Sequence, residues 1–512
     1  MITKVFAAAL QGIDATLITI EVNKTRGCSF YMVGLPDSAV KESQQRIHSA
    51  FSVLNIKMTV GAIIVNMAPA DIRKEGSAYD LPLAIGILGA SEIIQTTKFT
   101  DYLLMGELGL DGSLQPIKGA LPIAIKAREL GFKGMILPKQ NAREAAVVNN
   151  LDVYGVEHLK EVLDFLDDKV QLQPSIVHTR EEFFAHQSTY EADFSEVKGQ
   201  ESVKRAMEVA AAGSHNILLI GAPGSGKSML AKRLPSILPP LSLYESLETT
   251  KIHSVAGKIN ANGGLITTRP FRHPHHTISQ VAMTGGGSYP QPGEISLAHN
   301  GVLFLDELPE FSRNVLEVLR QPLEDRHISI SRVKSNVDYP ASFMLVAAMN
   351  PCPCGYYNHP THPCTCNPGQ VQKYLNKISG PLLDRIDLHI EVVPVPFEKM
   401  SEHRPAESSA SIRERVIKAR HIQEERYQDE PQVHCNAQMS KRLLDKYALP
   451  DADGLQLLRT AMIRLNLSAR AYDRILKVAR TIADLEGTKK VLAKHLAEAI
   501  GYRSLDRENW AG

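Results

Sequence analysis

Residues 221–228 read Gly-Ala-Pro-Gly-Ser-Gly-Lys-Ser and combine a glycine-rich turn with a lysine and a hydroxyl. Glycine permits the backbone turn that directs successive N–H groups at phosphate oxygens. In this pattern Lys227 reaches the β- and γ-phosphates of a nucleotide and Ser228 binds Mg²⁺. Apolar residues 217–220 precede the motif, as a strand before the loop requires. The sequence therefore predicts an ATP and Mg²⁺ site made by Gly221, Ala222, Pro223, Gly224, Ser225, Gly226, Lys227 and Ser228.

Two adjacent acids follow a second apolar run. Asp306 and Glu307 come directly after residues 302–305, so a buried strand would deliver both carboxylates at its end. After a phosphate-binding loop, Asp306 is expected in the Mg²⁺ shell and Glu307 is expected to polarise the attacking water. The predicted chemistry is ATP hydrolysis.

Three further polar residues complete the constellation. Asn350 ends a third apolar run and is expected to orient water beside the γ-phosphate. Arg385 is predicted to reach a neighbouring subunit's nucleotide as an arginine finger, the alternative being a salt-bridged surface residue. Arg470 opens a helix near the carboxyl end and is expected to contact the γ-phosphate, with Arg474 as its rival. These functional positions follow one another in the order typical of AAA+ ATPases, namely Lys227, Asp306, Glu307, Asn350, Arg385 and Arg470.

Four of the six cysteines form two Cys-x-Cys pairs separated by nine residues, namely Cys352, Cys354, Cys364 and Cys366. Four thiolates so placed could close a tetrahedral Zn²⁺ site. The usual spacing is Cys-x-x-Cys, and the tighter pair strains a single tetrahedral ion. Two interpretations therefore stay open: a zinc site, and a loop of reduced cysteines without metal.

Three domains are expected to position these residues, because 512 residues exceed what one hydrophobic core usually organises. Residues 1–170 alternate short β-rich runs with helical stretches, which indicates an α/β domain, and the polar residues 171–192 read as a linker. Residues 193–396 alternate again, with apolar strands suited to a parallel sheet. Residues 397–512 have helical periodicity, which predicts a helical lid domain.

Composition limits the partners and the location. The 57 basic and 56 acidic residues give a net charge of +1, so bulk charge identifies no nucleic-acid or membrane partner. The longest apolar stretches reach about half of the roughly 20 residues that span a bilayer, and no signal peptide is evident. We expect a cytoplasmic protein that does not bind a membrane.

Two other patterns have competing interpretations. The run Arg272-His273-Pro274-His275-His276 suggests a ring-pore or substrate loop more strongly than a metal site. Residues 328–337 alternate apolar and polar side chains, which predicts a hairpin before the third apolar strand. Arg332 and Lys334 on that hairpin either touch phosphates of a nucleic acid or lie on a solvated edge.

Taken together, the motifs resemble the Mg-chelatase-like AAA+ ATPases of the YifB/ComM type. The resemblance rests on FRHPHHT at 271–277, GEISLAHNG at 293–301, FLDELP at 304–309, NPCPCG at 350–355, SGPLLDRID at 379–387 and SAR at 468–470. It implies an ATPase core like the chelatase I subunit and a homo-oligomer, typically a hexamer. Competence-associated members act as DNA helicases that promote branch migration, so DNA is the implied partner. The alternatives are a chelatase-type motor for metal insertion and a protein-remodelling ATPase.

Residues 1–170 resemble the Lon proteolytic domain, of the ribosomal S5-like fold, through residues 74–78 and 106–117. Ser77 falls close to the position of the nucleophile. Where the Lon pattern has its lysine this chain has Leu121, and Lys118 lies one helical turn too early. Because Lon-type hydrolysis needs a serine and a lysine together, we expect no peptidase activity. A structural or partner-binding domain is the expected role.

Overall fold

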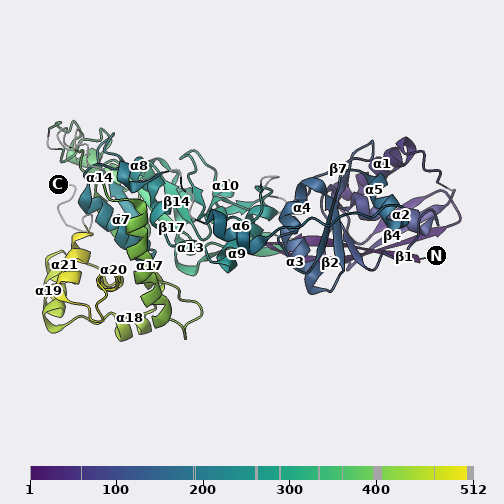
Figure 1. Ribbon diagram of the computed structural model, residues 1–512. Coiled ribbons are helices and arrows are strands. Elements are labelled where there is room, and N and C mark those ends of the chain that lie inside the picture. Colours follow the sequence, from purple (N-terminus) through teal and green to yellow (C-terminus); the bar gives the residue numbers. More distant parts are fainter. Residues whose placement is uncertain are drawn as a thin grey trace.

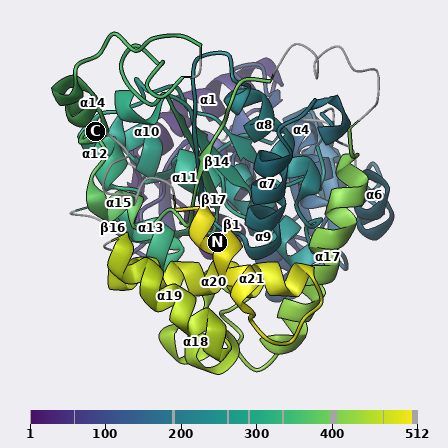
Figure 2. The same cartoon turned by 90° about the vertical axis from the view of Figure 1, so that its left-hand side faces the viewer.

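The computed structural model describes residues 2–58, 60–187, 190, 192–259, 263–287, 290–332, 335–359, 361–395, 406–465 and 467–503. The molecule is elongated, with the amino-terminal domain at one end (Figure 1). The other end holds the central domain and the carboxy-terminal helices, which lie side by side in both views (Figure 2). No helix of the described chain is long and apolar enough to cross a membrane.

The amino-terminal domain is a seven-stranded sheet with helices packed on it, which confirms the α/β expectation. The strands run in the order β3-β4-β2-β1-β5-β8-β9, and β1 and β2 form a long antiparallel hairpin. Helix α2 is buried along its whole length, because its sequence is apolar on every face. The strands are β1 (Ile2–Gln11), β2 (Asp14–Thr25), β3 (Phe30–Val33), β4 (Ala62–Ala68), β5 (Tyr102–Leu104), β8 (Gly134–Pro138) and β9 (Asp152–Val156), with a ribbon of β6 (Glu107–Leu108) and β7 (Leu114–Gln115). The helices are α1 (Ser38–Val53), α2 (Asp80–Ala90), α3 (Ala120–Glu129), α4 (Lys139–Ala145) and α5 (Leu159–Leu166).

The segment between the first two domains contains a helix, α6 (Thr179–His186), where the sequence suggested irregular chain. Phe183 is buried, and the hydroxyl of Thr179 donates to the Val147 carbonyl at 3.0 Å. Because these two residues are one helical turn apart, they lie on the same side of the helix. Tertiary contact with the amino-terminal domain stabilises a helix that periodicity alone did not indicate.

The central domain is built on a five-stranded parallel sheet in the order β11-β14-β17-β10-β18. Two of its strands coincide with the predicted runs, β10 (Ile217–Ile220) and β14 (Val302–Leu305), and the predicted third strand is β17 (Met344–Met349). Strand β17 lies between β10 and β14, so the ends of the three motif-bearing strands are neighbours. The other two strands are β11 (Phe271–Arg272) and β18 (Leu388–Glu391).

Helices and short ribbons cover this sheet. The elements are α7 (Glu201–Gly213), α8 (Lys227–Arg233), α9 (Leu243–Val255), α10 (Gln280–Thr284), α11 (Glu294–Leu297), α12 (Arg313–Glu317), α13 (Arg320–Asp325), α14 (Pro368–Leu375), α15 (Gly380–Leu383), β12 (Gly285–Gly286) and β13 (Gln291–Pro292). The helical segment that begins at Arg313 is broken between α12 and α13. Pro322 explains the break, since its ring would clash with the Val318 carbonyl of a continuous helix.

The predicted hairpin is confirmed as β15 (His327–Arg332) paired antiparallel with β16 (Ser335–Pro340). Lys334 and the side chain of Arg332 lie outside the described residues, so their proposed contact with phosphates stays a prediction. A Cβ on Gly12, in the β1–β2 turn, would lie 2.9 Å from the Val337 side chain. The amino-terminal domain therefore touches the hairpin.

Helix α9 is a second contact between the first two domains. The amide of Gly119, at the start of α3, donates to the Ser254 carbonyl at 3.1 Å. Lys251 of the same helix pairs with Asp14 at 3.0 Å. The amino-terminal domain is thus joined to α9, the second α-helix after the phosphate-binding loop (the P-loop, residues 221–228).

The carboxy-terminal region is helical, as expected. Its helices are α17 (Ser409–Arg426), α18 (Lys441–Tyr447), α19 (Ala452–Arg464), α20 (Ala469–Leu485) and α21 (Ala493–Gly501). Helices α17 and α20 pack against α7, and their apolar residues share one core with strand β10. A second apolar cluster lies on the opposite face of the sheet. The helical region therefore completes the core of the central domain on one face.

Candidate nucleotide-binding site

The loop between β10 and α8 has the backbone of a phosphate-binding turn. Gly224 and Gly226 have φ angles of 77° and 93°, in the region that glycine adopts at little cost. A Cβ on Gly221 would lie 2.3 Å from the Val392 carbonyl oxygen, so only glycine fits beside β18. The Oγ of Ser225 is buried and has no hydrogen-bond partner in the described chain. An unpaired polar atom inside this glycine turn fits a site built to receive phosphate oxygens.

Lys227 lies across the loop. Its Nζ donates to the carbonyls of Gly221 at 2.7 Å and Ala222 at 2.9 Å, and to Asn350 Oδ1 at 3.2 Å. The structure thus brings together the lysine and the amide that the sequence placed 123 residues apart. Burial lowers the pKa of Lys227, and the nearby Asp306 and Glu307 oppose that shift. A bound polyphosphate would favour the charged ammonium in the same way.

Ser228 and Asp306 meet at the end of β14. The serine hydroxyl donates to Asp306 Oδ2 at 2.5 Å, so both predicted Mg²⁺ ligands lie at one point. Two hard oxygen ligands beside a phosphate-binding loop suit Mg²⁺, which is commonly held by one or two protein oxygens together with nucleotide phosphates. The residues therefore fit ATP with Mg²⁺.

Glu307 follows Asp306 with a φ of 53°, and its amide donates to Asp306 Oδ1 at 2.9 Å. This turn separates the two carboxylates and leaves the Glu307 side chain 58% exposed. An accessible carboxylate beside the metal ligands is placed to accept a proton from water.

The histidine run lies at this site. His276 Nδ1 is 3.4 Å from Glu307 Oε2, and the His273 ring packs on Phe304 with centroids 4.7 Å apart. Burial lowers the pKa of His273, against the opposing effect of Asp306. Strand β11 runs beside β14 and so brings His273 and His276 to the carboxylate pair. The sequence-based interpretation as a pore or substrate loop stays a prediction.

We expect His276→Ala to lower kcat for ATP hydrolysis by about tenfold with little change in ATP affinity. The imidazole orients the exposed Glu307 carboxylate, and misplacing a catalytic group lowers rate more than binding. Steady-state kinetics and titration with a fluorescent ATP analogue measure the two effects. The matched control is His275→Ala, because the His275 ring bonds Thr277 instead of an acid. An unchanged kcat in His276→Ala would show that the contact has no catalytic role.

Arg385 is paired within its own chain. Its guanidinium lies 2.7 Å from Glu324 Oε1 and donates to the Pro381 carbonyl at 2.6 Å, and its side chain is 8% exposed. Its Nε is buried with no partner among the described residues. The structure therefore places Arg385 at α15 with one donor unused, and the trans contact stays a prediction.

The two candidate arginines of α20 have different environments. Arg474 pairs at 2.9 Å with the buried Asp387. Burial alone would raise the pKa of Asp387, but Arg474 and His215 hold it well below its ordinary value. Arg470 is 62% exposed and lies 3.4 Å from Asp384, next to Arg385 in the chain. Arg474 is thus held in a buried ion pair and Arg470 is exposed, and the contact of Arg470 with the γ-phosphate stays a prediction.

Sequence reasoning missed two residues that contact this site. Gln200 Nε2 donates to the Ser225 carbonyl at 2.7 Å and so holds the P-loop from the start of α7. Tyr374 of α14 is buried close to the backbone of Asn350. Neither belongs to a motif with a local signature, so only the tertiary contact reveals them.

The four clustered cysteines converge at one point. All four Sγ atoms lie within 4.8 Å of one another, and all are free thiols. The Sγ of Cys352 is 3.3 Å from that of Cys354 and 3.7 Å from that of Cys364. The intervening His359 stays outside the cluster, because its Nδ1 accepts the amides of Thr361 and His362.

The amino-terminal domain contains no Lon-type pair at the predicted positions. The Ser77 hydroxyl donates to the Glu107 carboxylate, and Leu121 is a fully buried aliphatic residue. The Lys74 ammonium donates to the Pro69 carbonyl. The partner of Ser77 is thus a carboxylate and not the lysine that Lon-type hydrolysis uses.

We expect Ser77→Ala to leave ATP hydrolysis unchanged, and we expect neither protein to show Lon-type proteolysis, because Leu121 stands where the Lon pattern has its lysine base. Casein digestion and ATPase assays on the full chain measure both. ATP-dependent casein cleavage that disappears in Ser77→Ala would contradict this expectation.

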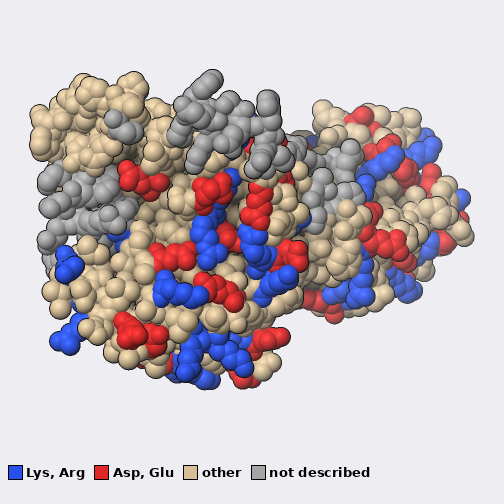
Figure 3. All heavy atoms as spheres, turned by 60° about the vertical axis from the view of Figure 1, so that its left-hand side comes forward, with Lys and Arg blue, Asp and Glu red and all other residues tan. Residues whose placement is uncertain are grey.

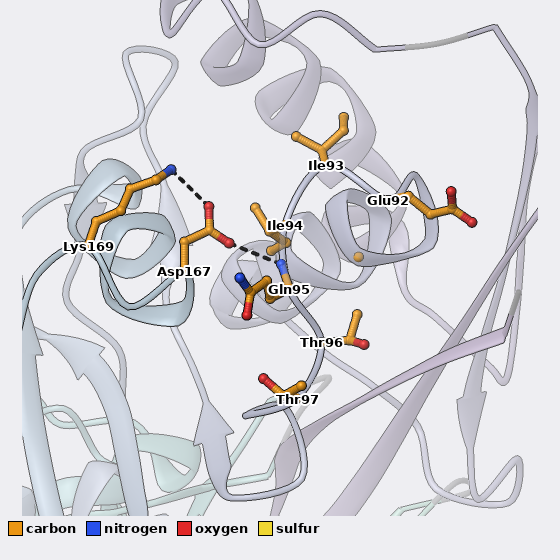
Figure 4. A pocket seen from close by; sticks show the side chains of 9 residues that line it. Glu92, Ile93, Ile94, Gln95, Thr96, Thr97, Asp167 and Lys169 are labelled. Carbon is orange, nitrogen blue, oxygen red and sulfur yellow. Dashed lines mark hydrogen bonds and ion pairs between the residues drawn. The ribbon is translucent and has the colours of Figure 1, made fainter.

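A hollow of about 500 Å³ lies in the amino-terminal domain (Figure 4). Asp167 at its wall accepts from the Gln95 amide at 3.0 Å and from the Lys169 ammonium at 2.9 Å. Both carboxylate oxygens are therefore used in structural bonds. None of the lining residues belongs to the nucleotide site.

Basic and acidic side chains alternate on the face shown in Figure 3, with no large area of one sign among the residues coloured. This agrees with the net charge of +1. A nucleic-acid partner is thus not indicated by charge on that face.

Family models cover most of the chain. One described as magnesium chelatase, subunit ChlI, matches residues 193–400, and one for the ChlI carboxy-terminal part matches residues 406–503. A third, described as subunit ChlI of Mg-chelatase, matches residues 20–141.

Two relatives extend over nearly the whole chain. Competence protein ComM of Haemophilus influenzae is 45% identical over 98% of this chain and 97% of its own. YifB of Escherichia coli, itself uncharacterized, is 43% identical over 98% of this chain and 97% of its own. The magnesium-chelatase 38 kDa subunit of Cereibacter sphaeroides is 24% identical over 31% of this chain and 52% of its own.

Proposed function

The chain belongs to the Mg-chelatase-like AAA+ family that includes ComM and YifB, and on that premise we propose that it is a cytoplasmic, ATP-driven hexameric motor that remodels DNA. Membership of the family supports an AAA+ ATPase of the ComM type. The proposed cofactors are ATP and Mg²⁺, with Zn²⁺ at the four cysteines. We further propose that the protein assembles as a hexamer and acts on branched or displaced DNA strands.

The main support for ATPase activity is one geometric observation. Ser228 hydrogen-bonds Asp306, and Lys227 hydrogen-bonds Asn350 at the same site. Lys227 binds the phosphates, and Ser228 and Asp306 hold Mg²⁺, which neutralises charge on them. Glu307 accepts a proton from the attacking water, and Asn350 orients that water. These side chains come from three adjacent strands and need no large movement to act together.

Two arginines support assembly into a ring. Arg470 lies 3.4 Å from Asp384, the neighbour of Arg385 in the chain. Among the described residues, no hydrogen bond or ion pair joins either arginine to residues 221–228 of the same chain. Arginines that stabilise the γ-phosphate transition state are often supplied by a neighbouring subunit. We assign both to the nucleotide of the adjacent protomer.

DNA is proposed as the substrate because of the ComM relationship, which extends over the whole chain. The chelatase relative matches only a third of the chain, which disfavours metal insertion into a porphyrin. A family model for subunit ChlI also matches residues 20–141, so metal insertion is retained as the alternative that the experiment below tests.

The test compares stimulation of ATP hydrolysis by forked DNA, linear duplex DNA, a porphyrin and an unfolded protein. We expect forked DNA to give the largest stimulation, and the Glu307→Gln protein is the control for contaminating ATPases. Preferential stimulation by the porphyrin or by the unfolded protein would replace the DNA proposal with the corresponding alternative.

A further inference from the structure

The cysteine cluster adjoins the nucleotide site, and we infer that Cys352, Cys354, Cys364 and Cys366 hold one Zn²⁺ that keeps the P-loop and Asn350 in their binding arrangement. This goes beyond the proposed cofactor, because it gives the metal a role in ATP binding. It rests on the proposed ATP site and is independent of DNA and of the hexamer.

The sulfur positions fit one tetrahedral ion. Zinc binds thiolates at about 2.3 Å, which places the sulfurs of a tetrahedral site about 3.8 Å apart. The Sγ–Sγ distances among Cys352, Cys354 and Cys364 are 3.3, 3.5 and 3.7 Å. The short Cys-x-Cys spacing thus does not prevent convergence. The sulfurs of Cys352 and Cys354 both lie within 3.7 Å of that of Cys364, and all four sulfurs lie within 4.8 Å of one another. A set of four thiolates favours zinc among common divalent ions.

The first link to ATP runs through the P-loop. Gly355, directly after Cys354, is buried and has a φ of 87°. A Cβ at Gly355 would lie 2.6 Å from Cδ of Pro223, so the loop that carries Cys354 lies against the P-loop. Displacing the cysteine loop would remove this support from Pro223.

The second link runs through Asn350. Cys352 is fully buried two residues after Asn350, whose amide oxygen accepts from Lys227. Helix α14 begins two residues after Cys366 with a capping box between Asn367 and Gln370, and its Tyr374 returns to the backbone of Asn350. The cysteines therefore join both chain segments that hold Asn350 in place.

Without an ion, four thiolates at this distance would repel one another, and the loop would be free to open. Bound metal offsets that repulsion and closes a link between residues 352–354 and residues 364–366. We therefore expect zinc to increase ATP affinity although no cysteine reaches the nucleotide.

The first measurement is the metal content of the purified full-length protein. We expect about one zinc per chain, lost in the double variant Cys364→Ala, Cys366→Ala and kept in Cys28→Ala, whose lone thiol is exposed in the amino-terminal domain. Absence of zinc from the parent, with no uptake on titration, would overturn the site. So would zinc retained at the parental level by the double variant.

The second measurement is ATP affinity, read with a fluorescent analogue. We expect the double variant to bind about tenfold more weakly, and Cys28→Ala to match the parent. Because the double variant could misfold, the unmutated protein is also stripped with a chelator, and affinity is expected to fall and to return with Zn²⁺. Cobalt in place of zinc should give the visible absorption of tetrahedral thiolate coordination.

Loss of zinc with unchanged ATP affinity in both the double variant and the stripped protein would overturn the coupling. Failure of the ATPase proposal would be seen separately, as absent ATP binding in the zinc-loaded parent.

Discussion

The Glu307→Gln variant is expected to bind ATP like the parent and to hydrolyse it at least about 100-fold more slowly. Glu307 lies beside Asp306 with an exposed carboxylate, and within the described part of the chain it makes no hydrogen bond or ion pair with residues 221–228. Replacing the carboxylate by an amide removes the proton acceptor and keeps the shape of the side chain. Single-turnover hydrolysis and equilibrium binding of a fluorescent ATP analogue separate the two effects.

The matched control is Lys227→Ala, which should weaken ATP binding itself. Lys227 lies over the loop that receives the phosphates, so its loss removes a ground-state contact as well as transition-state charge. The two variants should therefore fail at different steps. Hydrolysis at the parental rate by Glu307→Gln would remove the assigned role from that residue.

The second large effect concerns Arg385. We expect Arg385→Ala to reduce hydrolysis by about 10³-fold in assembled rings, because a guanidinium supplied by a neighbour stabilises charge on the γ-phosphate. Within one chain Arg385 is held by Glu324, whose side chain is 48% exposed. Glu324→Gln is the control: it removes only the resting partner and should leave hydrolysis near the parental rate.

Mixing two inactive variants tests whether Arg385 acts between subunits. Arg385→Ala keeps an intact P-loop, and Lys227→Ala keeps the arginine, so mixed rings contain interfaces in which both parts are sound. Activity should reappear on mixing, in rings verified by size in the presence of ATP and Mg²⁺. Full activity of Arg385→Ala in verified rings would leave this arginine as an ordinary salt-bridging residue.

Local sequence patterns were sufficient for the nucleotide loop and its strands. Strands β10 and β14 begin and end at the predicted residues, because short apolar runs bounded by glycine and acids have few alternatives in a parallel sheet. The pairing of Lys227 with Asn350 and of Ser228 with Asp306 follows once those strands are neighbours. Their order in the sheet, with β17 between β10 and β14, makes them neighbours.

Other features depended on contacts between distant segments. Arg470 and Arg474 are equivalent in a helical pattern, and only the buried Asp387 from another element distinguishes them. The histidine run has no local sign of where it lies, and the pairing of β11 with β14 decides that His276 meets Glu307.

The cysteine spacing argued equally for zinc and for a loop without metal. The fold brings the four sulfurs together and places Gly355 against Pro223. Sequence alone thus identified the residues proposed for phosphate chemistry, because that chemistry needs a short contiguous loop with a fixed order of residue types. The tertiary structure decided which arginine is left exposed, which histidine meets Glu307 and that the four cysteines converge, because these positions depend on neighbours that are far away in the chain.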